Sequence, residues 1–283
     1  MREEHERERI ERLHRRARER GVLGPLYVVV RLLVAPVLRL WFRMRISGAE
    51  HVPPSGAAII APNHKSFLDA FFVGVATRRR VRFMAKVELL RGPQGWLLGR
   101  LGAFPVRRGG ADAEAMDTAR LILEQGGVLV MFPEGTRVED PHALGSPHHG
   151  AGRLALLTGA PVIPAAIAGT QKLWFGPLPK PRRVQVAFLR PIDPARFEGR
   201  PDAVADLVDS ELWPAVEQEY RRELATPGLI LAALAAIGLG GGLLARRRAR
   251  AQTRLLGVVE PRKVRRRRSR RRLLARLRRP WRS

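Results

Sequence analysis

Two short polar strings carry the side chains whose types and spacing best suit chemistry. NHKSFLD (63–69) comes directly after the apolar run 57–62, and FPEGTR (132–137) begins where the apolar run 127–132 ends. In open α/β sheets, ligand-binding groups gather beyond the carboxyl ends of the strands. If both apolar runs are strands, the two polar strings form a candidate functional site.

His64 and Asp69 are the candidate acid–base pair of the first string. Ser66 and Asp69 also match a capping box for a helix through LDAFFVGVA (68–76), which would explain Asp69 without any chemistry. That structural interpretation leaves His64 unexplained. One helical turn can bring the Asp69 carboxylate to the imidazole, fixing its tautomer and leaving the second ring nitrogen to accept a proton. Such a pair can activate a hydroxyl group without a covalent enzyme intermediate.

The second string offers groups that bind anions. A strand-ending turn with solvated Glu134 and Arg137 is the structural alternative. In the chemical interpretation, backbone N–H groups of the turn and Arg137 surround an anion, because the planar fork of arginine donors fits phosphate. Arg107 closes GAFPVR (102–107) at another predicted strand end and would supply a second positive group.

Other catalytic chemistries find little support. The chain has no cysteine, which excludes thiolate catalysis, zinc-thiolate sites and disulfides. His142, His148 and His149 are close in sequence, but no carboxylate completes a recognisable metal-ligand spacing. The sequence therefore predicts no metal site.

The order of the motifs resembles that of a known family. The chain has His-x4-Asp (His64 to Asp69), Gly-x-x-x-x-Arg (102–107), FPEGTR (132–137) and an apolar run that ends at Pro164. These elements have the order and approximate spacing of the four sequence blocks of the 1-acylglycerol-3-phosphate acyltransferases and related glycerolipid acyltransferases. The resemblance covers about residues 25–225 and says nothing about the tail.

This resemblance implies a role for each motif residue. It makes His64 the general base and Asp69 the residue that orients it. The residues that it implies for the substrates are Arg107, Glu134, Gly135, Thr136 and Arg137 for the glycerol phosphate, and Pro164 on the acyl-donor side. It implies acyl-CoA or acyl carrier protein as co-substrate, with no other cofactor. One departure is His148-His149-Gly150, where relatives often have Lys-x-Gly.

The elements that must position these residues predict an α/β fold: a mixed, largely buried sheet flanked by helices. Continuous apolar runs indicate strands buried on both faces, and they lie at 57–62, 81–86, 102–107, 127–132, 160–167 and 184–189. DAEAMDTARLILEQGG (112–127) is the clearest helix, with Gly126 as its stop. A last helix is expected over much of 202–224, with a bend at Pro214.

The segments around this predicted acyltransferase domain (46–225) differ in charge and hydropathy. Residues 1–21 alternate acidic and basic groups, as a solvated helix does. Residues 22–45 form an apolar stretch interrupted by arginines, which predicts a helix in the membrane interface with the arginines reaching outward; an amphipathic core helix is the alternative. Residues 226–245 form an apolar membrane segment, and 246–283 a polybasic tail expected to be disordered.

Charge and topology together predict the cellular setting. Residues 226–283 hold 18 basic residues and one acidic residue, whereas 46–225 are nearly balanced with 22 and 19. A basic block beside an apolar stretch indicates an anionic membrane surface or nucleic acid. The membrane is favoured, at the cytoplasmic face and with monotopic or peripheral attachment, a single crossing by 227–245 being the alternative. The alternative functions are acyl transfer to glycerol 3-phosphate or another lysolipid, and nucleic-acid binding by the arginine-rich tail.

Overall fold

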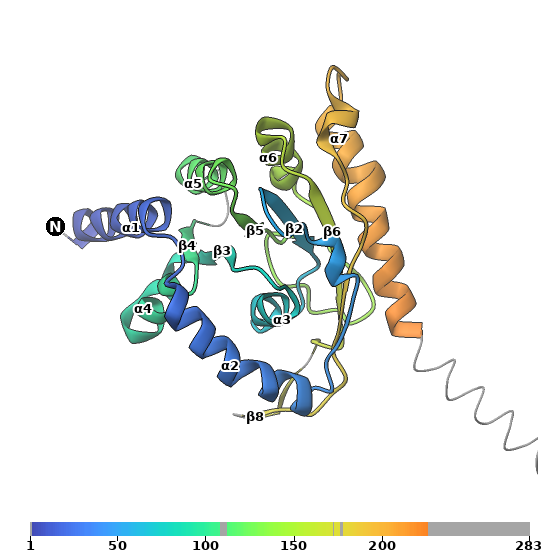
Figure 1. Cartoon of the computed structure of the whole chain (residues 1–283), viewed down its shortest axis with the longest axis horizontal. Coiled ribbons are helices and arrows are strands. Elements are labelled where there is room, and N and C mark those ends of the chain that lie inside the picture. Colours follow the sequence, from blue (N-terminus) through green and yellow to red (C-terminus); the bar gives the residue numbers. More distant parts are fainter. Residues whose placement is uncertain (1, 108–111, 172, 176–177, 226–283) are drawn as a thin grey trace, which may run out of the picture. The chain divides into compact units, whose positions relative to one another are not determined.

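The structure, a computed structural model, describes residues 2–107, 112–171, 173–175 and 178–225. Within this part the predicted α/β class is confirmed: a mixed sheet has helices on both faces (Figure 1). The segments predicted over 226–245 and 246–283 lie outside the described residues.

Strands form at all six predicted apolar runs. They are β2 (Ala58–Pro62), β3 (Val81–Lys86), β4 (Ala103–Val106), β5 (Val128–Val130), β6 (Val162–Ala168) and β9 (Gln185–Phe188). The sequence did not predict β1 (Arg45–Ser47) or the hairpin of β7 (Trp174–Phe175) and β8 (Leu178–Pro179). Two or three residues are too few for a hydrophobic period to be recognised.

The strand order places the two polar strings side by side. The seven-stranded sheet has the order β1-β9-β6-β2-β5-β3-β4, and β2 is parallel to its neighbour β5, with Ile60 opposite Val130. The sheet is mixed because β9 runs antiparallel to β6. Since β2 and β5 run in the same direction, the strings that follow them emerge at the same edge.

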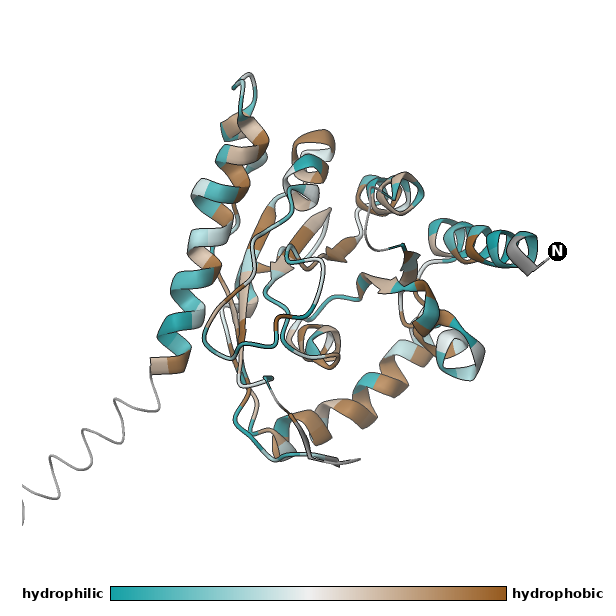
Figure 2. Cartoon of the chain, turned by 180° about the vertical axis from the view of Figure 1, so that it is seen from behind, coloured by the Kyte–Doolittle hydropathy of each residue, from teal (hydrophilic) through white to brown (hydrophobic). Residues whose placement is uncertain are grey.

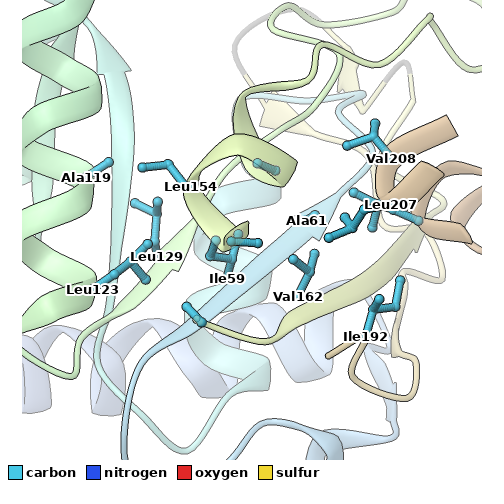
Figure 3. Packing of buried hydrophobic residues seen from close by; sticks show 14 of the residues in the cluster. Ile59, Ala61, Ala119, Leu123, Leu129, Leu154, Val162, Ile192, Leu207 and Val208 are labelled. Atoms are coloured by element: carbon cyan, nitrogen blue, oxygen red, sulfur yellow. The ribbon is translucent and has the colours of Figure 1, made fainter. Parts of the chain in front are cut away.

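Both faces of the sheet are buried, which explains the continuous apolar runs. On one face Ile59 and Leu129 pack against α5 (Ala113–Glu124) and α6 (Gly150–Thr158), as Figure 3 shows. On the opposite face Ile60 and Val130 pack against α3 (Asp69–Ala76) and α2 (Gly24–Trp41). Alternate residues of one strand therefore belong to two cores.

The two helices predicted in detail are present. In α5 the Asp112 carboxylate caps the first turn by accepting from the Ala115 N–H at 3.3 Å, and Gly126 has a φ of 73° just after the helix. The last helix begins as α7 (Ala203–Ala205), widens to a π-helical segment over Asp206–Leu212 and continues to residue 225. The irregularity precedes Pro214, which has no N–H to donate and whose ring crowds the preceding turn.

The N-terminal helix α1 (Arg2–Glu19) is not the fully solvated helix that its charges predict. One face is buried against α5 and contains Ile10, His14 and Ala17. His14 Nδ1 lies 2.9 Å from Thr118 Oγ1. Because apolar residues are sparse in α1, its sequence shows no hydrophobic period that would predict this buried face.

Docking of α1 is expected to weaken in mild acid. Burial lowers the pKa of His14 from 6.5 to about 4. Between these values the unfolded chain binds a proton that the folded chain does not, so the stability that neutral His14 provides is present above pH 6.5 and is lost toward pH 4. Between pH 7 and pH 5, the urea midpoint of unfolding should fall more for the wild type than for His14→Gln. Equal pH dependence would contradict this assignment.

Helix α2 lies within the predicted segment 22–45, ends before the segment does, at Trp41, and has an outward apolar face. Its exposed large side chains include Val29, Leu32, Leu33 and Leu40, and it is the one helix among the described residues that is long and apolar enough to cross a membrane. Figure 2 shows this helix as a largely hydrophobic ribbon along one side of the domain. Arg31 does not reach outward as expected, because its guanidinium donates to the Val75 carbonyl at 3.3 Å.

Candidate active site

The centre of the site is the predicted pair of His64 and Asp69. His64 Nδ1 lies 3.0 Å from Asp69 Oδ2, and both residues are buried. Since a carboxylate only accepts, the pair fixes the proton on Nδ1 and leaves Nε2 with its lone pair. His64 Nε2 makes no hydrogen bond within the described chain. The ring therefore has the tautomer that a general base requires.

The backbone of the first string holds Asp69 in place. Asp69 Oδ2 also accepts from the backbone N–H groups of Lys65 at 2.6 Å and Ser66 at 2.7 Å, while Oδ1 is buried without a partner among the described residues. The predicted capping box is half formed. Asp69 reaches back to the Ser66 N–H as expected, but helix α3 begins at Asp69 and the Ser66 hydroxyl accepts from Leu68 N–H instead. One carboxylate oxygen thus shapes the loop and orients the imidazole.

Phe132 of the second string supports the imidazole ring. The two rings are stacked, with centroids 4.0 Å apart and planes inclined by 24°. Phe132 follows β5 just as His64 follows β2, so the stacking depends on the parallel pairing of these strands. Stacking and the hydrogen bond to Asp69 together leave the ring little freedom to rotate.

Glu134 points into the protein and not toward a substrate. Its Oε2 accepts from the His64 backbone N–H at 2.6 Å, and its Oε1 accepts from Gly145 N–H at 2.8 Å. Burial raises the pKa of this carboxyl group, and the two N–H donors oppose that shift. The role in phosphate binding that the resemblance implied is therefore not what this geometry offers. Glu134 ties the loop that carries His64 to the loop that contains Gly145.

Lys65 and Tyr220 anchor the loop that leads to Gly145 by donating to its backbone carbonyl groups. Lys65 Nζ donates to the carbonyl oxygens of Asp140 (2.8 Å) and Ala143. The Tyr220 hydroxyl, on the last helix, donates to the Pro141 carbonyl at 2.7 Å. Burial lowers the pKa of Lys65 and raises that of Tyr220. The sequence analysis predicted neither anchor. Only Lys65 could have been suspected, because it is part of the first polar string.

The remainder of the second string is open to solvent. Gly135, Thr136 and Arg137 are exposed, and Arg137 forms no ion pair with the described residues. Gly135 has a φ of 64°, and a Cβ there would lie 2.9 Å from the His148 ring, so a side chain at this position is excluded twice. The turn therefore presents backbone and a guanidinium group outward, as an anion site requires.

Arg107 is at the predicted strand end but is already paired. It follows β4, with 57% of its side chain exposed, and its guanidinium lies 3.6 Å from the carboxylates of both Asp112 and Glu114. Strands β5, β3 and β4 are parallel neighbours spaced about 4.8 Å apart. Arg107 and Arg137 thus emerge at the same edge of the sheet, two strands apart.

Pro164 and the neighbouring Asn63 lie in the sheet beside the site. Pro164 is buried in β6 opposite Ala61 of β2. The Asn63 side chain donates to Ile167 O at 3.0 Å and accepts from Ile167 N–H at 2.7 Å, which extends the β2–β6 pairing by one residue before His64. Asn63 thus holds the chain beside β6 where β2 ends, and the donor-side role of Pro164 remains a prediction.

The histidines that follow the second string do not gather as metal ligands. His149 Nε2 pairs with Asp209 Oδ2 at 2.9 Å, and the His148 ring lies against Gly135. Among the described residues, no three His, Asp or Glu side chains are grouped as a metal site would need.

Known proteins match this architecture. A protein-family model described as Acyltransferase matches residues 43–168, which include both polar strings. The fold is also that of the crystal structure of the 1-acyl-sn-glycerophosphate (LPA) acyltransferase PlsC from Thermotoga maritima, with a TM-score of 0.58 and 24% identity over 75% of this chain and 83% of that one. The family-model match thus places residues 43–168 in the acyltransferase class.

Similar proteins with assigned names identify the family within this class. The 1-acyl-sn-glycerol-3-phosphate acyltransferase alpha of Mus musculus is 31% identical over 210 residues, which cover 71% of this chain and 72% of the mouse protein. The chain belongs to the 1-acyl-sn-glycerol-3-phosphate acyltransferase family, as the motifs indicated. A chloroplastic relative from Arabidopsis thaliana is 31% identical over 137 residues, and the match spans 47% of this chain and 38% of that relative.

Proposed function

We propose that this protein transfers a fatty acyl group from acyl-CoA or acyl carrier protein to the free hydroxyl of 1-acylglycerol-3-phosphate, giving phosphatidic acid. The observation that carries the proposal is the His64–Asp69 contact of 3.0 Å, which leaves Nε2 open as a base. Family membership supports acyl transfer as the reaction, and the exposed Arg137 turn supports a phosphate-bearing acceptor.

The proposed reaction needs one base and no covalent enzyme intermediate. His64 Nε2 takes the proton of the acceptor hydroxyl as its oxygen attacks the thioester carbonyl. The new C–O ester bond forms, the C–S bond breaks, and the thiolate leaves with the proton that His64 releases. Asp69 stays ionised and stabilises the imidazolium between the two proton transfers.

An apolar groove in the domain supports a lipid substrate. It lies between α2, α3 and β3 and is lined by side chains that include Tyr27, Val34, Phe71 and Phe83. An apolar lining of this kind suits the acyl chain of a lipid.

The outward apolar face of α2 supports attachment to a membrane. Tyr27 and Leu38 are the buried residues of this helix, whereas Val29, Leu32 and Leu33 are more than half exposed. The helix packs lengthwise against the domain through α3, so it lies along the domain surface. We propose monotopic or peripheral attachment at the cytoplasmic face, where thioester donors are found.

A substrate panel tests the proposed acceptor. Acyl transfer from radiolabelled acyl-CoA should be fastest to 1-acylglycerol-3-phosphate, slower to glycerol 3-phosphate and slower to lysolipids with larger headgroups. The same panel with acyl carrier protein as donor compares the two thioesters. A higher kcat/KM for glycerol 3-phosphate would overturn the proposed acceptor but not the acyl transfer.

Arg137→Ala is expected to weaken acceptor use tenfold to a hundredfold. A lost charge-assisted hydrogen bond contributes about 1.5–3 kcal/mol, which corresponds to this range. Arg107→Ala should have a smaller effect, because Asp112 and Glu114 already share its charge. The loss should appear in kcat/KM for 1-acylglycerol-3-phosphate. Arg137→Lys should keep part of the wild-type kcat/KM because it keeps the positive charge. An equal loss with an acceptor that lacks phosphate would contradict the assignment.

A further inference from the structure

Three arginines meet where helices α1, α2 and α4 (Gly92–Arg100) come together. Arg16 is in the last turn of α1, Arg20 directly follows the helix and donates its N–H to the Arg16 carbonyl at 2.9 Å, and Arg100 ends α4. The Leu23 N–H at the start of α2 donates to the Arg100 carbonyl at 2.9 Å, which fixes the end of α4 beside the start of α2. We call Arg16, Arg20 and Arg100 the arginine corner.

The arginine corner lacks the acidic partners that several other arginines in or beside these elements have. Arg12 of α1 pairs with Glu8, and Arg91, just before α4, pairs with Glu6. Within the described residues, no ion pair joins an acid to the three arginines of the corner. Their charges repel one another instead: burial lowers the pKa of Arg16, and Arg100 and Arg20 lower it further.

Two features leave this charge uncompensated. The Arg16 Nε is buried and has no hydrogen-bond partner, which is uncommon for a buried donor in a folded protein. The carboxyl ends of α1 and α4 offset part of the charge, but each helix end carries only about half a negative charge. Two such ends balance about one of the three cations. The remaining positive charge makes the corner a surface that attracts anions.

Apolar side chains surround the arginine corner on its outer side. The Arg100 guanidinium lies over the Trp96 ring at 3.7 Å, and Trp96 is itself 56% exposed. Leu97, which follows Trp96 in sequence, is exposed, and so is Leu23, whose N–H donates to the Arg100 carbonyl and which begins the outward apolar face of α2. Arginine and tryptophan beside exposed leucines are the combination that suits the level of lipid headgroups.

The corner is separate from the catalytic site. Arg100 comes just before β4 begins, whereas His64 and the Arg137 turn follow the carboxyl ends of β2 and β5. Because β2, β5, β3 and β4 are parallel, the arginine corner lies at the opposite edge of the sheet from the reacting groups.

We propose that the arginine corner binds the phosphate group of an anionic phospholipid headgroup. This binding is non-catalytic and rests on the proposed membrane attachment through α2. The guanidinium groups would hold the phosphate while Trp96 and Leu97 enter the interface beside it. The bound headgroup would also fix the angle at which α2 lies on the membrane.

Vesicle flotation with the full chain tests this proposal. The test variant is Arg16→Gln/Arg100→Gln, and the matched control is Arg12→Gln/Arg91→Gln, which removes the same charge from α1 and from the residue just before α4. Each basic residue near an anionic surface strengthens binding about fivefold, so the test variant should bind phosphatidylglycerol-containing vesicles roughly 25-fold more weakly. The control should lose much less, and pure phosphatidylcholine vesicles should not distinguish the two.

The outcomes separate this inference from the proposed function. Equal binding by the test and control variants would overturn the headgroup site while leaving membrane attachment intact. Failure of the wild type to bind either kind of vesicle would overturn the proposed attachment itself. As a folding check, lipid-free thermal melting should show the test variant at least as stable as the wild type, because like-charge repulsion is removed. Inorganic phosphate that raises the melting temperature without any vesicle discrimination would indicate a free anion as ligand and overturn the lipid assignment.

Discussion

His64→Ala should abolish measurable acyl transfer while the domain stays folded. The variant loses the group that we propose takes the hydroxyl proton, and general-base catalysis contributes about 10²–10⁴-fold to a rate. The fold should tolerate the change, because Asp69 Oδ2 keeps its two backbone donors, Lys65 and Ser66, when the imidazole is gone. Glu134 also keeps its contact with residue 64, since that hydrogen bond uses the backbone N–H.

The measurement is initial-rate acyl transfer from radiolabelled acyl-CoA, with thermal melting to confirm folding. His142→Ala is the matched control, because His142 is an exposed histidine whose backbone N–H, not its ring, is hydrogen-bonded to Asp140. The control should retain full activity. Near-normal rates in a folded His64→Ala variant would refute the catalytic assignment.

Asp69→Asn should lower kcat by about 10²–10⁴-fold, the second largest effect. An asparagine cannot stabilise the imidazolium by charge. Its N–H group can also donate to His64 Nδ1, which places the ring proton on Nε2 and removes the base. A stability loss of about 1–3 kcal/mol should accompany it, because three donors converge on one buried oxygen and their charge-assisted bonds are weakened.

Rate and stability must be separated in this experiment. Activity measured well below the melting temperature isolates the chemical defect, and kcat should fall far more than KM changes. Asp140→Asn is a suitable control, because that aspartate is exposed and caps the nearby loop through His142 N–H. A defect in Asp69→Asn that disappears when the assay temperature is lowered would show that Asp69 acts on stability alone.

Local sequence was sufficient for the parts of the site that are close along the chain. His64 and Asp69 are five positions apart, so a loop and the first turn of α3 bring them together without distant help. The strands were predictable for a related reason. Burial on both faces requires consecutive apolar residues, and runs such as 57–62 record that requirement directly.

Only the tertiary structure decided which polar groups face a substrate and which face the protein. Glu134 and His64 are 70 positions apart, and their contact exists because β2 and β5 are parallel neighbours, an arrangement that hydrophobic patterns do not encode. The same holds for Arg107, which meets Glu114 of α5, and for His14, which meets Thr118 of that helix across 104 positions. A sequence does not show whether a charged residue is solvated or paired, because the packing of distant elements determines its partner. The apolar pattern therefore located the strands and the polar strings that follow them, while the strand order and the packing of α1, α5 and the two loops assigned each charge its partner.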